Sequence, residues 1–223
     1  MRWTVLSLGY FSRNRYWGED EGRSYRSALC TSTFVEIGGK RLVIDPPAPP
    51  GLMGEILDQR TGLKPEAVDY VFITHKHGDH FVGLEAFPNA LLLAPPEEWD
   101  DIGRQIRDSE ASVHYADPAG LAARLRPAGK EIMPGVAAIP LPGHTMGLTG
   151  AVFEGPEGRI VAAGDAVMTA DHFFHRQGYY NSVDFEISRE SIEKIAGIAD
   201  LVVPGHGNYF LTRLKGGGST ASF

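Results

Sequence analysis

The chain has 223 residues, 43% of them hydrophobic, with a formal net charge of −7 at pH 7 and a single cysteine. This composition predicts one globular domain over residues 1–213 and a flexible tail over residues 214–223, which is rich in glycine and small side chains. The negative charge argues against nucleic acid as the main partner, which would need a basic surface. A single cysteine excludes an internal disulfide, and no apolar stretch is long enough to predict a membrane-spanning helix.

The few basic clusters do not change this interpretation. The pairs Arg104/Arg107 and Arg124/Arg126 are predicted to lie on helices among acidic residues, where they form solvent-exposed faces. The first residues lack the long apolar core of a secretory signal, so we expect a cytoplasmic protein.

The sequence pattern of the first half of the chain predicts mainly strands and only a few helices. Apolar and β-branched runs predict strands over residues 3–11, 28–37 and 41–44, with Gly38-Gly39 as the turn between the last two. Cys30 falls in the second of these strands, where we expect it to act as a small buried hydrophobe. A proline run then leads into a helix over residues 53–59. Strands over residues 68–73 and 91–94 follow, with a short helix over residues 81–87 between them.

The second half alternates helix and strand more clearly. A helix over residues 97–109 carries Trp99, Ile102 and Ile106 on one face. Strands and turns alternate from residue 130 to residue 165, including apolar runs at 137–141 and 159–163. A helix over residues 188–199, with Ser188 as the candidate N-cap, leads into a last strand over residues 200–203.

Residues 74–80, Thr-His-Lys-His-Gly-Asp-His, are the most informative segment of the chain. They place three of the 8 histidines and one aspartate directly after the strand predicted over residues 68–73. Alternate residues of an extended loop point the same way, so His75 and His77 can share one direction while Asp79 and His80 approach from another. Imidazole nitrogen and carboxylate oxygen bind borderline metals such as zinc. The segment therefore predicts a metal site at a sheet edge.

Three further candidate ligands follow strand-like runs. His144, Asp165 and His206 come shortly after the apolar runs at 137–141, 159–163 and 200–203, and each is directly preceded by glycine. Glycine permits unusual dihedral angles and close backbone approach, both of which a crowded metal centre requires. A single histidine after a strand is usually structural, but five histidines and two aspartates at matching positions predict one shared site.

With these residues in this order, the chain resembles the metallo-β-lactamase superfamily. The resemblance runs through the His-x-His-x-Asp-His motif at 75–80 and the three later candidates, and it covers nearly the whole chain. It implies an α/β (α+β) fold, a four-layer αββα metallo-β-lactamase sandwich, with a dinuclear metal site on one edge. The family pattern implies one metal ion on His75, His77 and His144, a second on Asp79, His80 and His206, and Asp165 as the bridge between them.

The resemblance also implies the chemistry. The expected cofactors are two divalent metal ions, zinc first and iron or manganese as alternatives, which together supply a bridging hydroxide near neutral pH. Asp79 is the candidate catalytic residue, because a ligating carboxylate beside the attacking water can orient it and then carry a proton to the leaving group. Thr74 and Thr145 adjoin ligands and serve either as hydrogen-bond partners of the site or as ordinary turn residues.

Departures from particular branches of the family narrow the expected reaction. Members that destroy antibiotics have a cysteine in place of Asp165 or lack the bridging carboxylate, and diiron reductases have an acid in place of His77. Small lactonases resemble this chain in size and in the run Gly164-Asp165-Ala166. We therefore expect a metal-dependent, lactonase-like hydrolase of an ester-like small molecule, with a lactone favoured.

The segment over residues 168–184 is a candidate wall of the substrate pocket. It contains His172, His175, Tyr179 and Tyr180, and a tyrosine there could donate a hydrogen bond to an oxyanion. The alternative is that these aromatic residues pack a surface helix or an oligomer contact.

Other activities stay open on the same fold. One is a persulfide dioxygenase with a single iron ion, since histidine and aspartate suit iron as well as zinc. Another is a phosphodiesterase or thioester hydrolase that uses the same paired metals. The non-enzymatic alternative is a scaffold that has lost its chemistry. We expect a small-molecule substrate and no nucleic-acid or membrane partner, and a homodimer remains open.

Overall fold

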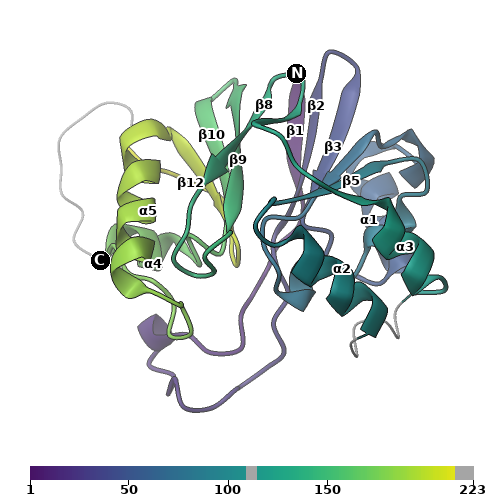
Figure 1. Ribbon diagram of the computed structural model, residues 1–223. Coiled ribbons are helices and arrows are strands. Elements are labelled where there is room, and N and C mark those ends of the chain that lie inside the picture. The colour runs from purple at the N-terminus through teal and green to yellow at the C-terminus, as the bar shows by residue number, and fades with distance from the viewer. Residues whose placement is uncertain (109–114, 214–223) are drawn as a thin grey trace.

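The computed structural model describes residues 1–108 and 115–213, which form two six-stranded mixed sheets stacked face to face (Figure 1). The first sheet has the order β1 (Arg2–Ser7), β2 (Ser32–Ile37), β3 (Lys40–Ile44), β4 (Tyr70–Phe72), β5 (Leu91–Ala94) and β6 (Leu125–Pro127). The second has the order β12 (Phe210–Leu211), β11 (Leu201–Pro204), β10 (Gly158–Gly164), β9 (Thr149–Gly155), β8 (Val136–Pro140) and β7 (Glu131–Met133).

Helices cover the outer face of each sheet (Figure 1). The first sheet carries α1 (Pro50–Thr61), α2 (Trp99–Asp108) and α3 (Pro118–Arg124), and the second carries α4 (Ala170–Phe174) and α5 (Phe185–Ile198). Single 3-10 turns lie at η1 (Arg15–Trp17), η2 (Pro65–Ala67), η3 (Gly78–His80) and η4 (Leu84–Ala86).

The period-2 alternation of strand side chains explains the layers. On β3, Val43 packs toward the helices, whereas Leu42 and Ile44 pack against the other sheet. On β10, Ile160 faces the inter-sheet core, whereas Val161 packs with α5. Apolar layers thus lie between helices and sheet, between the two sheets, and again between sheet and helices, which confirms the four-layer αββα sandwich.

Strand direction brings distant loops to one edge. β3 and β4 run parallel, as do β10 and β11. β8 and β10 are both antiparallel to β9, so these two strands also run in one direction. The carboxyl ends of β4, β8, β10 and β11 carry the candidate ligands. The loop between β1 and β2 passes along the same edge (Figure 1), where the backbone N–H of Thr31 donates to the carbonyl of Gly205, 2.6 Å away.

Several predicted elements have other bounds in the structure. β1 ends at Ser7 and β2 begins at Ser32, because between them only Tyr10 and Leu29 pair, as an isolated bridge. The helix expected over residues 53–59 is longer, beginning at Pro50 with the proline tolerated in the first turn. The helix expected over residues 81–87 is wrong, since only the 3-10 turn η4 forms there.

The later helices also differ from expectation. Asp184 caps α5 by accepting from the backbone N–H of Ile187 at 2.9 Å, whereas Ser188 lies inside the helix, so the predicted N-cap is wrong. Arg126 lies on β6 rather than on a helix. α2 covers most of the predicted helix over residues 97–109, whose last residue lies outside the described residues, as does the predicted tail over residues 214–223. In the described part of the chain, every helix is too short or too polar to cross a membrane.

Candidate metal centre

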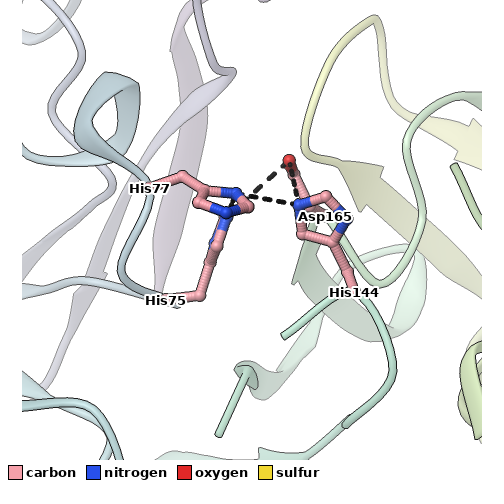
Figure 2. A group of neighbouring side chains, drawn as sticks. All are labelled: His75, His77, His144 and Asp165. Carbon is pink, nitrogen blue, oxygen red and sulfur yellow. Dashed lines mark hydrogen bonds and ion pairs between the residues drawn. The ribbon is translucent and has the colours of Figure 1, made fainter. Parts of the chain in front are cut away.

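The candidate ligands converge from both sheets into two groups. The first group combines two histidines from the loop after β4 with one residue each from the loops after β8 and β10: His75, His77, His144 and Asp165. Figure 2 shows that the members of this group come from opposite sides of the site and point toward one another. The second group combines two residues of η3 with one residue from the loop after β11: Asp79, His80 and His206.

The distances within the first group fit a metal ion. His77 Nδ1 lies 3.0 Å from His75 Nε2 and 2.9 Å from His144 Nε2. Asp165 Oδ2 lies 3.3 Å from His144 Nε2 and 3.7 Å from His75 Nε2. Ligands placed tetrahedrally about 2.0–2.1 Å from zinc would lie about 3.3 Å from one another. The four ligand atoms are therefore spaced as a single ion requires.

The carboxylate of Asp165 faces both groups. Oδ2 points toward the first group, while Oδ1 lies 3.3 Å from His80 Nε2 and 3.3 Å from His206 Nε2. Asp79 Oδ2 completes the second group at 3.7 Å from His206 Nε2. One oxygen on each side is the arrangement that a carboxylate bridging two ions requires.

Backbone and side-chain partners fix the orientation of the imidazole rings. Nδ1 of His206 lies 2.9 Å from the carbonyl oxygen of Leu29 and 3.1 Å from that of Tyr10. Nδ1 therefore carries the proton that is donated, and in the neutral ring Nε2 keeps a free lone pair. Nδ1 of His75 lies 3.2 Å from Thr74 Oγ1, which itself donates to the carboxylate of Asp45. In both residues, the nitrogen that faces the site is the one free to bind a metal.

Asp45 contacts the candidate ligands from behind, although the sequence pattern did not point to it. It follows β3 and is 2% exposed, and its Oδ2 lies 3.0 Å from His80 Nδ1 and 2.7 Å from Thr74 Oγ1. Its Oδ1 accepts from the backbone N–H of Thr74 at 2.7 Å. A carboxylate behind a histidine fixes the ring and its tautomer, and so supports metal binding. The only signal in the sequence was an acid directly after a strand.

The pKa shifts differ between the two groups around Asp165. They favour neutral rings at His75 and His77, whereas neighbouring negative charges, among them Asp165, outweigh burial and raise the pKa of His80 and that of His206. Burial lowers the pKa of His75 well below its ordinary value and lowers the pKa of His77 to about 4. Burial alone would raise the pKa of Asp165, but the positive charges of His206 and His80 outweigh it and hold that pKa well below its usual range. Neutral imidazole and carboxylate are the forms that ligate metals.

Two buried polar atoms at the centre of the cluster have no hydrogen-bond partner among residues 1–108 and 115–213. They are His80 Nε2 and Asp165 Oδ1, which face each other. Buried polar atoms are normally paired, because an unpaired one costs about 1–3 kcal/mol. A cation between the groups would satisfy both atoms, so the residues present fit a metal ion.

Close backbone approach explains one of the glycines before the ligands. A Cβ at Gly205 would lie 2.0 Å from Asp165 Oδ1, so a side chain there would displace the carboxylate that faces both groups. Of the two threonines, Thr74 bonds to Asp45, whereas Thr145 Oγ1 is buried and without a hydrogen-bond partner in the described part of the chain. Cys30 is fully buried, as predicted, and burial raises its pKa to about 12.

A cavity of about 170 Å³ opens over the site. Its floor includes candidate ligands from both groups, and its walls include Phe11, Met168, Tyr179 and Tyr180. The structure thus brings the two predicted tyrosines to the cavity. His172 and His175 do not line it: the ring of His172 packs edge-on against Tyr16, and that of His175 stacks on Tyr16.

Comparison with known proteins agrees with this geometry. The sequence pattern of the Metallo-beta-lactamase superfamily matches residues 27–206. Metallo-beta-lactamase domain-containing protein 1 of Xenopus laevis is 30% identical over 158 residues, which are 68% of this chain and 59% of that protein. An N-acyl homoserine lactonase from a Bacillus species is 25% identical over 142 residues, 61% of this chain and 53% of the lactonase.

The chain therefore spans somewhat more than half the length of these two relatives. Among solved structures, a metallo-beta-lactamase-like protein of Thermotoga maritima shares the fold with a TM-score of 0.69 at 18% identity, over 94% of this chain and 98% of that one. The match of the family pattern to most of the chain, with a His/Asp cluster suited to metal ions, shows that this protein belongs to the metallo-beta-lactamase superfamily, whose fold is that of metal-dependent hydrolases.

Proposed function

We propose that this protein is a hydrolase with two divalent metal ions, zinc in first place, that cleaves an ester-like small molecule, with a lactone as the favoured substrate. The proposal rests on the orientation of the Asp165 carboxylate, whose two oxygens face two separate groups of candidate ligands. His75, His77 and His144 would hold one ion, and Asp79, His80 and His206 the other.

The bound ions would supply an activated water molecule and polarise the carbonyl oxygen of the substrate. Asp79 is the residue best placed to move a proton. Its side chain is 27% exposed and lines the cavity, whereas that of Asp165 is 5% exposed and enclosed by histidines. A carboxylate at the cavity surface can accept a proton from the attacking water and deliver it to the leaving alcohol oxygen.

The cavity supports a small substrate. Its volume of about 170 Å³ suits a small ring or ester group. Tyr180 lies at the wall of the cavity and is 37% exposed, whereas the hydroxyl of Tyr179 already donates to the carbonyl of Arg13 at 2.8 Å. Tyr180 is therefore the better candidate to donate a hydrogen bond to the oxyanion.

The lactone is favoured over other esters by the N-acyl homoserine lactonase relative at 25% identity. The Gly-Asp-Ala run at 164–166 and the long segment that follows it, part of which lines the cavity, point the same way. A phosphodiester and a thioester use the same paired ions and belong in the same test.

The first experiment is metal content by elemental mass spectrometry on protein never exposed to chelator, followed by turnover of a lactone, a thioester and a nitrophenyl phosphodiester. About two equivalents of metal per chain, with the lactone turned over fastest, is the expected result. One equivalent of iron, with oxygen consumption on a glutathione persulfide, would contradict the proposal and favour a dioxygenase.

Ligand variants test the site directly. Asp165→Asn and His144→Ala are expected to lower kcat/KM at least about 100-fold and to reduce the bound metal, because each removes an atom from the cluster. His175→Ala is the histidine control, because His175 is exposed and its ring stacks on Tyr16 outside the cavity. A near-wild-type rate in His144→Ala would rule out the proposed first ion.

A further inference from the structure

Glu98 is a buried acid outside the candidate ligand set. It lies directly before α2 and is 3% exposed, although its neighbour Glu97 is exposed. An ionised carboxylate is rarely buried unless hydrogen bonds satisfy its oxygens. The partners of Glu98 therefore indicate what it does.

Both oxygens of Glu98 bond to loops that carry candidate ligands. Oε2 accepts from the backbone N–H of Lys76 at 2.8 Å, between His75 and His77. Oε1 accepts from the backbone N–H of Gly147 at 2.9 Å, in the loop between β8 and β9 that also carries His144. One side chain thus joins the loop after β4 in the first sheet to the loop after β8 in the second.

α2 strengthens the hold on the first of these loops. Gln105 Nε2 donates to the carbonyl of Lys76 at 2.9 Å, and Lys76 Nζ pairs with Asp101 at 3.2 Å. The backbone N–H, the backbone carbonyl and the side chain of Lys76 are all bound by residues at or within α2. The peptide between the two histidines cannot turn without breaking these bonds.

The geometry of Glu98 requires a carboxylate. Two N–H groups from different loops need two acceptor oxygens, and charge-assisted bonds of this kind are stronger than neutral ones. A glutamine would present one oxygen and one NH₂ group, so one loop would lose its acceptor and face a second donor.

We propose that Glu98 is a positioning residue that sets the spacing of His75, His77 and His144 around one of the two metal ions. The inference rests on the proposed function, because it needs a metal at that group. Asp45 contacts the other group directly, through Nδ1 of His80, and reaches His75 only through Thr74. Glu98 contacts only the loops of the first group, so the two buried acids differ in the group that they contact directly.

The test compares zinc affinity in Glu98→Gln with that in the matched control Glu97→Gln, using competition with a chromogenic chelator on metal-free protein reloaded with zinc. In Glu98→Gln, one of the two zinc ions should bind roughly 10–100-fold more weakly while the other keeps its affinity. Glu97→Gln should match the wild type. Asp45→Asn should weaken the ion of the other group at least as much as the first, so the double variant Glu98→Gln/Asp45→Asn should bind both zinc ions less tightly than the wild type.

Spectra of cobalt-substituted protein give a second readout that a general loss of stability would not produce. Glu98→Gln should change the band of one cobalt ion and leave that of the other. If Glu98→Gln does not fold, Glu98→Asp, which keeps the charge but has a shorter reach, takes its place with the same expected result. Unchanged affinity for both ions, or equal weakening of both, would overturn the inference. Absence of two metal ions in the wild type would instead contradict the proposed function.

Discussion

The two tyrosines of the cavity differ in what their hydroxyl groups can do. That of Tyr179 is engaged by the carbonyl of Arg13, and burial raises its pKa to about 12. The guanidinium carbon of Arg13 lies 4.4 Å from the centre of the Tyr180 ring, and the hydroxyl of Tyr180 forms no hydrogen bond among the described residues.

Tyr180→Phe is therefore expected to lower kcat on a lactone roughly 100-fold, the effect of removing an oxyanion donor. Tyr179→Phe is the matched control, expected to keep kcat within about threefold, and steady-state kinetics would separate the two. An equal loss in both variants would show that packing, not hydrogen bonding, matters.

His172 makes a separate contribution to stability. Its ring packs edge-on against Phe11 and Tyr16, and burial lowers its pKa to about 4. A histidine in the unfolded chain titrates near 6.5, so between these values the unfolded state binds a proton that the folded state does not. The stability linked to His172 is therefore complete above pH 6.5 and decreases as the pH falls toward 4.

Replacing His172 by phenylalanine removes this linkage. The metal-free wild type should lose stability when the pH is lowered from 7 to 4.5. In His172→Phe, the decrease in the free energy of unfolding over the same range should be smaller by on the order of 2 kcal/mol. Urea unfolding at the two pH values measures the difference. The same pH dependence in both proteins would show that the ring is not buried as described.

Individual residues also show what the sequence could reveal about the site. Each of the seven candidate ligands is a histidine or an aspartate that follows a strand-like run, so their convergence could be predicted. Asp45 and Glu98 could not be assigned in this way. Asp45 precedes a proline run, and Glu98 stands in an acidic pair at a helix start, where carboxylates are usually solvated. Their roles depend on contacts with residues at least 22 positions away along the chain.

At the scale of elements, the loop of residues 142–145, which carries His144, packs closely against the start of α5. Gly143 has φ +131°, and a Cβ there would lie 2.3 Å from the backbone nitrogen of Ser188. Gly143→Ala should therefore lower the free energy of unfolding by at least about 2 kcal/mol. Gly197→Ala, at an exposed helical position with open space around it, should instead raise it by about 0.5–1 kcal/mol. Denaturant unfolding of the two variants measures both effects. Equal effects of the same sign would contradict the close packing of α5 on this loop.

Elements with a clear period could be predicted, and those set by tertiary contacts could not. β4 and β10 follow β-branched, apolar runs, and α2 presents a regular apolar face. The short α3 has no such pattern, and its N-cap, Asp117, is recognised only from its bond to the backbone N–H of Gly120. The start of α5 was misplaced for a related reason, because both Asp184 and Ser188 are residue types that cap helices.

For the whole molecule, the metal centre is a connection between the two sheets. His75, His77, Asp79 and His80 follow a strand of the first sheet, and the remaining three candidate ligands follow strands of the second. The four-layer arrangement could be predicted from the family resemblance. The strands β6 and β12 could not, because they are too short to show an alternating pattern in the sequence. The direction of the longer strands then accounts for the placement of all seven residues on one edge.

Because the ions would bind only the folded arrangement of both sheets, removing them should destabilise the entire sandwich. A ligand present at 100 times its dissociation constant stabilises a protein by about 2.7 kcal/mol, and in a chain of this size each kcal/mol shifts Tm by roughly 2–4 °C. Chelation should thus lower Tm by roughly 5–10 °C, and zinc should restore it, as measured by calorimetry. In Asp165→Asn, which has lost the carboxylate facing both groups, chelation should shift Tm by much less. If chelation removed the metal and left the wild-type Tm unchanged, metal binding would not contribute to the stability of the folded sandwich, and this prediction would be wrong.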